Sequence, residues 1–268
     1  TDVQGAPIYP ALMHRWQREP SIVRHALLAA MYSAILGHTA EESHPRVIEL
    51  TFAVLLMDVG MMRVPENIRT KEQSLTEGEK SILHTHPVTG YKLLTQMGKV
   101  KNNIALVALQ HQEHYDGSGY PRKIKGADMS AESRIAAIAE SYVAMLEKKS
   151  YRQARIPYEA MKELLTLGIY RYDPYLLKSF LNALSIYPVG SLVELSDGTL
   201  GITMAGVAQK PMRPIIGVLR DNKGNAPKGL HWIHLLYETD KYIVRARSAE
   251  ELGVSYQAEL ESFGQKFL

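Results

Sequence analysis

Residues 52–58 read FAVLLMD, an apolar run that ends on an acid. Leu55 and Val54 lie three and four positions before Asp58, so a helix through this run turns the carboxylate towards the side that carries its hydrocarbon. A buried carboxylate is so unfavourable that it must be neutralised, paired with a cation or bound to a metal. The run therefore predicts a buried helix with a polar site at its end.

Helical spacing of apolar residues continues from about residue 20 to residue 186, interrupted by Pro and Gly. Thr76 followed by Glu79 has the spacing of a capping box, which predicts a helix that begins at Glu77. The fold class expected is mainly α, a bundle of helices. Helices are expected over 21–37, 46–58, 77–86, 87–97, 100–113, 131–147, 157–168 and 173–185.

After residues 187–190, YPVG, the pattern changes to short β-rich runs. Asp197-Gly198 predicts a hairpin turn, because Gly accepts the positive φ of tight turns. Ser248 and Glu251 have the spacing of a cap for a possible terminal helix. Strands are expected over 192–195, 200–204, 215–219, 232–236 and 242–245. Three regions follow: an N-terminal linker or remnant of a preceding segment over 1–19, a helical domain over 20–186 and a small β-rich C-terminal extension over 187–268.

Composition narrows the classes of function. The 268 residues are 46% hydrophobic, enough to bury a core, and contain no Cys, so His and carboxylates are the strong metal ligands available. The net charge is +3 and the Lys and Arg residues are scattered, which argues against DNA binding and favours a small anionic ligand. The absence of Cys also leads us to expect a cytoplasmic protein. Apolar stretches such as 26–32 and 52–57 are shorter than the roughly 18 residues of a membrane span, so no span is expected.

Three more ionisable residues lie among apolar neighbours at helical spacing: His25, His111 and Glu140. Each residue alone has a plain structural interpretation. A histidine can be a core residue with satisfied hydrogen bonds, and a carboxylate can cap a neighbouring helix. As a set with Asp58, projecting inward from separate helices with no Lys or Arg on the same faces, they favour a metal site in the bundle core. Mixed His and carboxylate ligation suits Fe, Mn or Zn better than Mg or Ca.

Residues 111–121 read HQEHYDGSGYP. Two glycines and a proline directly after a helix predict an abrupt, defined loop, in which aromatic residues are unusual for a simple linker. The DGSG part alone is more typical of a flexible turn than of a binding loop.

Together these stretches resemble the HD-GYP proteins, a branch of the HD phosphohydrolases that hydrolyse cyclic di-GMP. Residues 111–121 are similar to the family signature HHExxDGxGYP, with Gln112 at its second histidine, and residues 57–65, MDVGMMRVP, are similar to its block HDIGKIGVP. Met57 and Met61 replace the histidine and lysine of that block. Further similarities are residues 75–77 (LTE), His86-Pro87, Tyr151-Arg152 and His25, which aligns with the first histidine of the superfamily.

The resemblance implies an HD-superfamily helical bundle with a centre of two divalent metal ions. Fe and Mn are the ions expected first. The ligands it implies are His25, Asp58, His86, His111 and Glu140, with Asp58 bridging the ions; Glu140 replaces an aspartate, and Ser21 lies where some members carry a glutamate for a third metal. Ligand orientation and loop shape would depend on Gln112, Glu113, Asp116, Gly117, Gly119, Tyr120 and Pro121. Lys149 and Arg152 are expected to bind the ligand's phosphates or bases, or else to be solvated surface charges.

Three functions remain open on this reading. The first is a phosphodiesterase that hydrolyses cyclic di-GMP at a dinuclear site, with Asp58 as the catalytic residue. The second is a catalytically weak or inactive cyclic di-GMP receptor, or a module whose exposed loop 117–121 docks on a signalling protein; Met57, Met61 and Gln112 favour it. The third is an HD phosphohydrolase acting on another phosphate ester, although ordinary superfamily members lack the signature of 111–121.

Overall fold

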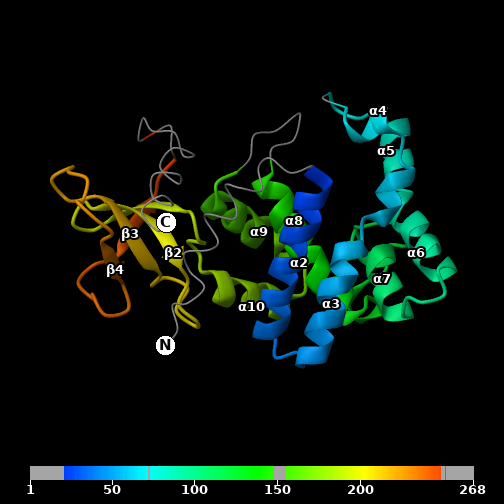
Figure 1. Ribbon diagram of the computed structural model, residues 1–268, viewed down its shortest axis with the longest axis horizontal. Helices are drawn as coiled ribbons and strands as arrows, with labels where there is room; N and C mark the ends of the chain where they lie inside the picture. The colour runs from blue at the N-terminus through cyan, green and yellow to red at the C-terminus, as the bar shows by residue number, and fades with distance from the viewer. Residues whose placement is uncertain (1–20, 72, 148–154, 249–250, 252–268) are drawn as a thin grey trace. The chain divides into compact units, whose positions relative to one another are not determined.

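The computed structural model describes residues 21–71, 73–147, 155–248 and 251 (Figure 1). These residues fall into two compact units, one within 20–155 and 163–180 and the other within 156–162 and 181–268. The first unit is built of helices and the second centres on a small antiparallel sheet. The mainly α fold with a C-terminal β-rich module is thereby confirmed. In the described part of the chain, no helix has the length and apolarity needed to cross a membrane.

The helical segments follow the spacing of the apolar residues. They are α2 (Ser21–Thr39), α3 (His44–Leu56), η1 (Val59–Arg63), α4 (Glu66–Arg69), α5 (Glu77–Leu83), α6 (His86–Gln96), α7 (Asn102–Gln110), η2 (Gly126–Asp128), α8 (Ala131–Leu146), α9 (Pro157–Arg171) and α10 (Pro174–Leu184). The capping box at the start of α5 is present: the Thr76 hydroxyl accepts from the Glu79 N–H, and the Glu79 carboxylate accepts from the Thr76 N–H at 2.7 Å.

The core of the helical unit lies where α2, α3 and α8 pack together. Alanines 136, 137 and 139 on α8 are fully or almost fully buried, and their small side chains let the neighbouring helices approach closely. Tyr142 is fully buried and makes edge-to-face contacts with Tyr32 and Phe180, at ring-centroid distances of 5.0 and 5.3 Å. This rigid aromatic cluster anchors α8 in the unit.

A second contact holds the short helix η1 against α6. Gly60 makes it possible: a Cβ at this position would overlap the carbonyl oxygen of His86 and lie 2.7 Å from the backbone nitrogen of Gly90. Only a glycine allows two backbones to approach so closely without a shift. Asp58, two residues before Gly60, is therefore held beside the first turn of α6.

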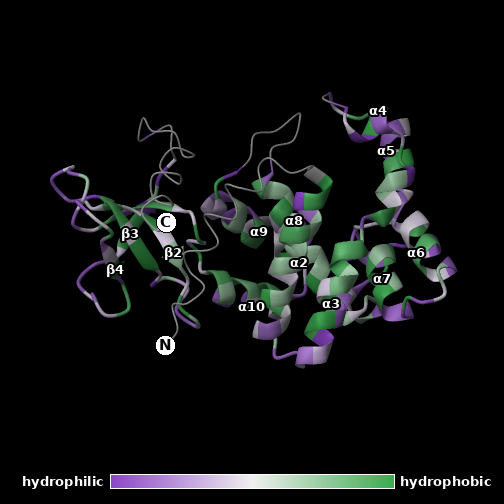
Figure 2. Ribbon diagram, viewed as in Figure 1, coloured by the Kyte–Doolittle hydropathy of each residue, from purple (hydrophilic) through white to green (hydrophobic). Residues whose placement is uncertain are grey.

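The sheet unit has five antiparallel strands in the order β4-β3-β2-β1-β5. They are β1 (Leu192–Leu195), β2 (Leu200–Ala205), β3 (Ile215–Arg220), β4 (Trp232–His234) and β5 (Ile243–Ala246). The predicted hairpin turn joins β1 to β2, with Gly198 at a φ of 86° and its N–H donating to the Leu195 carbonyl. In Figure 2 strands β2 and β3 are hydrophobic and the loops around them hydrophilic. The core consists of Tyr187, Val193, Leu195, Ile216, Val218, Ile233 and Leu235.

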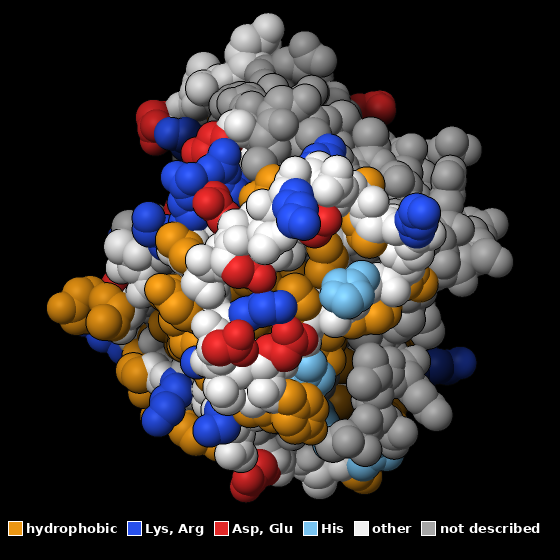
Figure 3. All heavy atoms as spheres, turned by 90° about the vertical axis from the view of Figure 1, so that its left-hand side faces the viewer, with side chains coloured by type: hydrophobic (Ala, Val, Ile, Leu, Met, Phe, Trp, Pro, Cys, Tyr) orange, Lys and Arg blue, Asp and Glu red, His pale blue; other side chains and the backbone are white. Residues whose placement is uncertain are grey.

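The surface of the sheet unit carries charges of both signs. Figure 3 shows the molecule from the left-hand side of Figure 1, where β3 and β4 lie, with Lys and Arg side chains intermixed with Asp and Glu. Glu194 on β1 accepts from both Arg245 and Arg247 at 3.0 Å.

Several predicted boundaries were wrong by one to three residues. The helix expected over 46–58 ends at Leu56, and the one expected over 100–113 ends at Gln110. Asp58 instead has φ −91° and ψ 10° and starts η1, a turn that apolar spacing does not reveal. The strand expected over 232–236 ends at His234. Ser248 and Glu251 make the reciprocal backbone hydrogen bonds of a cap, but the possible terminal helix and region 1–19 lie outside the described residues.

Candidate metal centre

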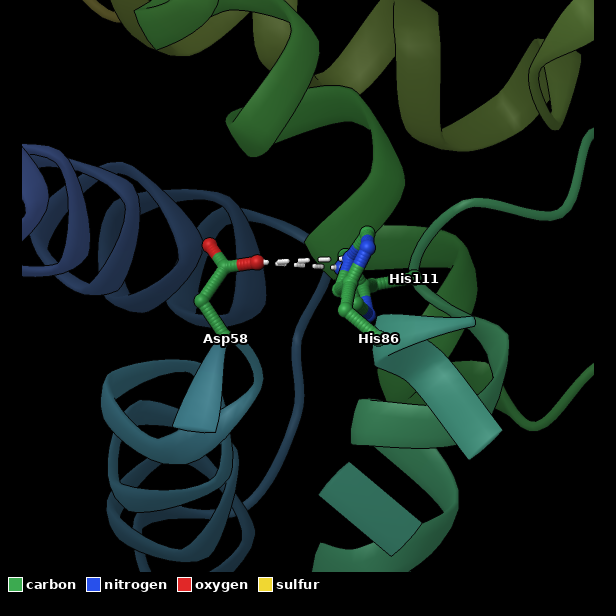
Figure 4. Close-up of side chains that lie close together, drawn as sticks. All are labelled: Asp58, His86 and His111. Carbon is green, nitrogen blue, oxygen red and sulfur yellow. Dashed lines mark hydrogen bonds and ion pairs between the residues drawn. The ribbon is translucent and has the colours of Figure 1, made fainter. Parts of the chain in front are cut away.

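Asp58, His86 and His111 lie together in the helical unit (Figure 4). Asp58 Oδ1 is 3.5 Å from His86 Nε2 and 3.4 Å from His111 Nε2, and the two imidazole nitrogens are 3.1 Å apart. In the described part of the chain this is the one group of three His, Asp or Glu residues whose ligand atoms all lie within 4.8 Å of one another. Both histidines are buried, and Asp58 keeps 18% of its side chain exposed.

The backbone decides which ring nitrogens face the cluster. His86 Nδ1–H donates to the Leu83 carbonyl at 2.8 Å, and His111 Nδ1–H donates to the Ala108 carbonyl at 2.9 Å. In each case the acceptor is the carbonyl three residues earlier. With Nδ1 protonated, the neutral ring presents an Nε2 lone pair, so two lone pairs and a carboxylate oxygen converge on one point.

The spacing of these atoms suits a shared cation. Atoms bound to one ion at about 2.1 Å lie about 3.0 to 3.4 Å apart when the angle between the bonds is between a right angle and the tetrahedral angle. The triangle formed by Asp58 Oδ1, His86 Nε2 and His111 Nε2 has edges of 3.1, 3.4 and 3.5 Å. Two imidazoles with one carboxylate are a donor set for borderline ions such as Fe²⁺, Mn²⁺ or Zn²⁺.

The three groups shift one another's pKa values. Burial raises the pKa of Asp58, but the hydrogen bond and charge of His111, together with the other histidines, outweigh burial and lower it. Burial lowers the pKa of His111, and the hydrogen bond and charge of Asp58 overcome this and raise it. Burial and the charge of His111 lower the pKa of His86 to about 4. Asp58 and His111 thus favour each other's charged form.

His25 approaches Asp58 from the opposite side. Its Nε2 is 3.9 Å from Asp58 Oδ2, and its Nδ1 is 3.0 Å from a carboxylate oxygen of Glu147. Burial lowers the pKa of His25, but the hydrogen bond to Glu147 and the surrounding carboxylates outweigh it and raise it. A carboxylate behind a histidine is a common way to direct the other ring nitrogen at a metal.

Glu147 was missed by the sequence analysis, although it is 6% exposed and fixes His25. It follows α8 directly, where a glutamate normally suggests a solvated helix end. A signal was present: Glu147 is seven residues after Glu140, which places both on one face of a helix.

Glu140 is partly buried on α8 and its Oε1 accepts from the side-chain amide of Gln112 at 3.0 Å. Its charge acts on His25 and His111, where it raises both pKa values. Glu140 therefore lies near the cluster, but one of its oxygens is already engaged. Met57, beside Asp58 in the chain, is fully buried and gives the site no strong ligand.

The loop over 111–121 is fixed by its backbone. Glu113 is fully buried, and one carboxylate oxygen accepts from the Arg122 N–H at 2.6 Å. A Cβ on Gly119 would come within 2.5 Å of the Gln112 carbonyl and of the Glu113 Cα, so this close turn needs glycine. The Tyr120 ring stacks on His84 with centroids 3.9 Å apart and meets His86 edge-on. The loop thus packs directly against a cluster residue, and Pro121 follows Tyr120 through a cis peptide bond.

The expectation of an exposed loop over 117–121 was only partly right. Asp116 and Ser118 are exposed, whereas Gly117, Tyr120 and Pro121 are partly buried and Gly119 is buried. The Asp116 side chain accepts from the Ser118 N–H, and Gly117 has a φ of 79°, so the tip is a tight turn. Lys149 and Arg152 lie outside the described residues.

Comparison of the sequence with known protein families identifies the family of this chain. Residues 10–176 match the HD domain family, and residues 192–255 match the KOW domain associated with HD domain. With the signature over 111–121 and the relatives described next, the chain belongs to the HD domain family, in its HD-GYP branch.

Two curated relatives illustrate the likeness. The cyclic di-GMP phosphodiesterase PA4108 of Pseudomonas aeruginosa is 29% identical over 203 residues, which are 76% of this chain and 49% of that protein. The cyclic di-GMP phosphodiesterase PdeB of Borreliella burgdorferi is 28% identical over 198 residues, 74% of this chain and 52% of that protein. This chain therefore spans about half the length of these relatives.

A solved structure shares the fold. Bd1817, an HDG"Y"P protein from Bdellovibrio bacteriovorus, superposes with a TM-score of 0.53 at 18% identity, over 65% of this chain and 60% of that chain.

Proposed function

We propose that this protein is a metal-dependent phosphodiesterase that hydrolyses cyclic di-GMP. The observation that carries the proposal is the convergence of Asp58 Oδ1, His86 Nε2 and His111 Nε2 at distances suited to one divalent ion. The substrate is proposed because PA4108 and PdeB, to which about three quarters of the chain is similar, are both named cyclic di-GMP phosphodiesterases.

The metal would be Fe or Mn, since imidazole and carboxylate donors together suit these ions better than Mg or Ca. A bound divalent ion supplies a water of lowered pKa as nucleophile and neutralises charge on the phosphoryl oxygens. Asp58 has the central place, with one oxygen towards His86 and His111 and the other towards His25. His25 and Glu140 are the proposed further ligands.

The remaining roles stay predictions. Gln112, Glu113 and Asp116 would orient the ligands and hold the loop, and Lys149 and Arg152 would bind phosphates or bases. Docking of a signalling protein on the loop at 117–121, of which Ser118 is exposed, is a further prediction. So is cytoplasmic residence, which rests on the composition alone.

A second candidate function is a receptor that binds cyclic di-GMP without hydrolysing it. Two features of the site favour it: Met57 contributes no strong ligand, and the amide of Gln112 occupies an oxygen of Glu140. If the site cannot assemble the ion arrangement required for turnover, the protein would still offer a cation and a shaped loop to the phosphates of the nucleotide.

The test is incubation of the full chain, loaded with Mn²⁺ or with Fe²⁺ under reducing conditions, with cyclic di-GMP, followed by chromatography. Linear product is expected from wild type and from the control Asp240→Ala, an exposed aspartate of the sheet unit, and not from Asp58→Ala. Tight binding without product would reject the enzyme in favour of the receptor. Met57→His combined with Gln112→His should then raise metal content and produce turnover.

A further inference from the structure

We propose that the cation positions on the two sides of Asp58 are unequal. One ion is held tightly by Asp58, His86 and His111, and a second, on the side of His25 and Glu140, is held weakly because Gln112 competes for Glu140. The inference rests on the proposed metal site and is independent of the substrate.

The first position has three donor atoms that face one another. His86 and His111 use their Nδ1–H groups on backbone carbonyls, so both Nε2 atoms are directed at Asp58 Oδ1. The three ligand atoms already stand at the separations that one ion imposes, 3.1 to 3.5 Å. Little reorganisation is needed to bind, and preorganised donors give high affinity.

The second position is wider and less complete. His25 Nε2 and Asp58 Oδ2 are 3.9 Å apart, more than the spacing within the first cluster. Among the described residues, His25 and Glu140 do not join Asp58 in a second group with all ligand atoms within 4.8 Å. Met57, next to Asp58, is fully buried and offers a thioether, a poor ligand for these ions.

Gln112 is the residue that controls this second position. Its backbone carbonyl accepts from the Tyr120 N–H at 3.1 Å, so the loop holds the residue in place. Its side-chain amide donates to Glu140 Oε1 at 3.0 Å, so this carboxylate already has a hydrogen-bond partner before a second ion binds. A second ion must share Oε1 with the amide, which weakens that oxygen as a donor, or bind the other oxygen alone. A hydrogen bond to a charged group is strong enough to lower the ion's affinity by roughly tenfold or more.

The experiment is a Mn²⁺ titration of the metal-stripped full chain, in which calorimetry measures binding and electron paramagnetic resonance records the spectrum of the bound ions. Wild type should take up one Mn²⁺ per chain tightly, with the spectrum of an isolated ion, and a second at least tenfold more weakly. Gln112→Met removes the amide donor and keeps a side chain of similar size. It should raise the affinity for the second ion roughly tenfold, and the spectrum should then show spin coupling between the two ions. Gln96→Met, at an exposed end of α6, is the matched control and should behave as wild type.

Glu140→Gln separates the two positions. It should leave the tight ion unchanged and abolish the second, whereas His111→Ala should lose the tight ion. Two ions of equal affinity in wild type, or a tight ion that disappears in Glu140→Gln, would overturn the inference and leave the metal site standing. Absence of any tight Mn²⁺ or Fe²⁺ would overturn the inference and the proposed function together.

Discussion

At the scale of single residues, the candidate site depends on small constraints placed on a few side chains. Backbone carbonyls of Leu83 and Ala108 set the tautomers of His86 and His111, and Gly60 brings Asp58 close to them. None of these constraints comes from a metal ligand. The site is therefore preorganised by the fold, and its first test is to disturb the fold locally.

Gly60→Ala should be strongly destabilising, because the added methyl overlaps backbone atoms of α6 that cannot move alone. We expect a loss of about 3 kcal/mol in the free energy of unfolding, measured by urea denaturation of the metal-stripped chain. Gly78→Ala is the matched control: its Cβ would meet nothing within 4 Å, and in the first turn of α5 it should leave the free energy of unfolding unchanged or slightly higher. Equal effects of the two changes would contradict the close contact at Gly60.

Glu147 should matter for metal binding because its carboxylate contacts the His25 ring. Glu147→Ala removes the acceptor that orients His25, so binding of the weaker ion should fall by about 10- to 100-fold while the tight ion is retained. Calorimetric Mn²⁺ titration measures both. Glu132→Ala is the control. It removes a glutamate of α8 that pairs with Arg46 of α3, and it should change neither affinity. Loss of the tight ion in Glu147→Ala would show that His25 belongs to the first position.

At the scale of elements, apolar periodicity located the helices well and their ends poorly. Periodicity reports which face is buried, and a helix keeps that signal until the turn at which the chain changes direction. Asp58 lies two residues after the end of α3 and His111 directly follows α7, and both were expected inside those helices. The ring nitrogens that face Asp58, and the engagement of Glu140 by Gln112, depend on contacts between distant segments, which spacing alone does not contain.

The start of α5 yields a prediction about pH. The hydrogen bonds from Lys71 and Thr76 lower the pKa of Glu79 from 4.5 to about 2. A folded-state pKa below the ordinary value gives stability that is present above about pH 4.5 and is lost as the pH falls through about 2. The effect is small, because the carboxylate is near solvent and its ion pair is screened.

Thermal unfolding of wild type and Glu79→Gln across this range measures the effect. Wild type should have the higher Tm above pH 4.5, and the difference should shrink towards pH 2, since the amide does not titrate. A difference that stays constant over the range would mean that the charge of Glu79 contributes nothing.

At the scale of the whole molecule, the chain has two cores with different chemistry. The helical unit holds the cluster of Asp58, His86 and His111, and the sheet unit packs its own apolar core around residues such as Val193 and Ile233. Near residue 187 the sequence changes from apolar residues at helical spacing to short β-rich runs. This change predicts the two cores, because a helix and a strand bury apolar residues at different periods, 3.6 and 2. The boundaries at 19, 20, 186 and 187 themselves stay predictions.

Metal should therefore stabilise one unit and not the other. Saturating Mn²⁺ at about 100 times its dissociation constant should stabilise the helical unit by about 2.7 kcal/mol, seen as a higher Tm for helical circular dichroism. Hydrogen exchange of the amides in β1 to β3 should stay unchanged, since no ligand of the cluster lies in those strands. Equal protection of both units would contradict their independence.

The central claim is that Asp58, His86 and His111 hold one divalent ion between them. Anomalous X-ray scattering from crystals of the Mn²⁺-loaded chain tests it most directly. We predict a strong peak about 2.1 Å from Nε2 of His86, Nε2 of His111 and a carboxylate oxygen of Asp58. A peak elsewhere, or none at these three side chains in the loaded protein, would contradict the account.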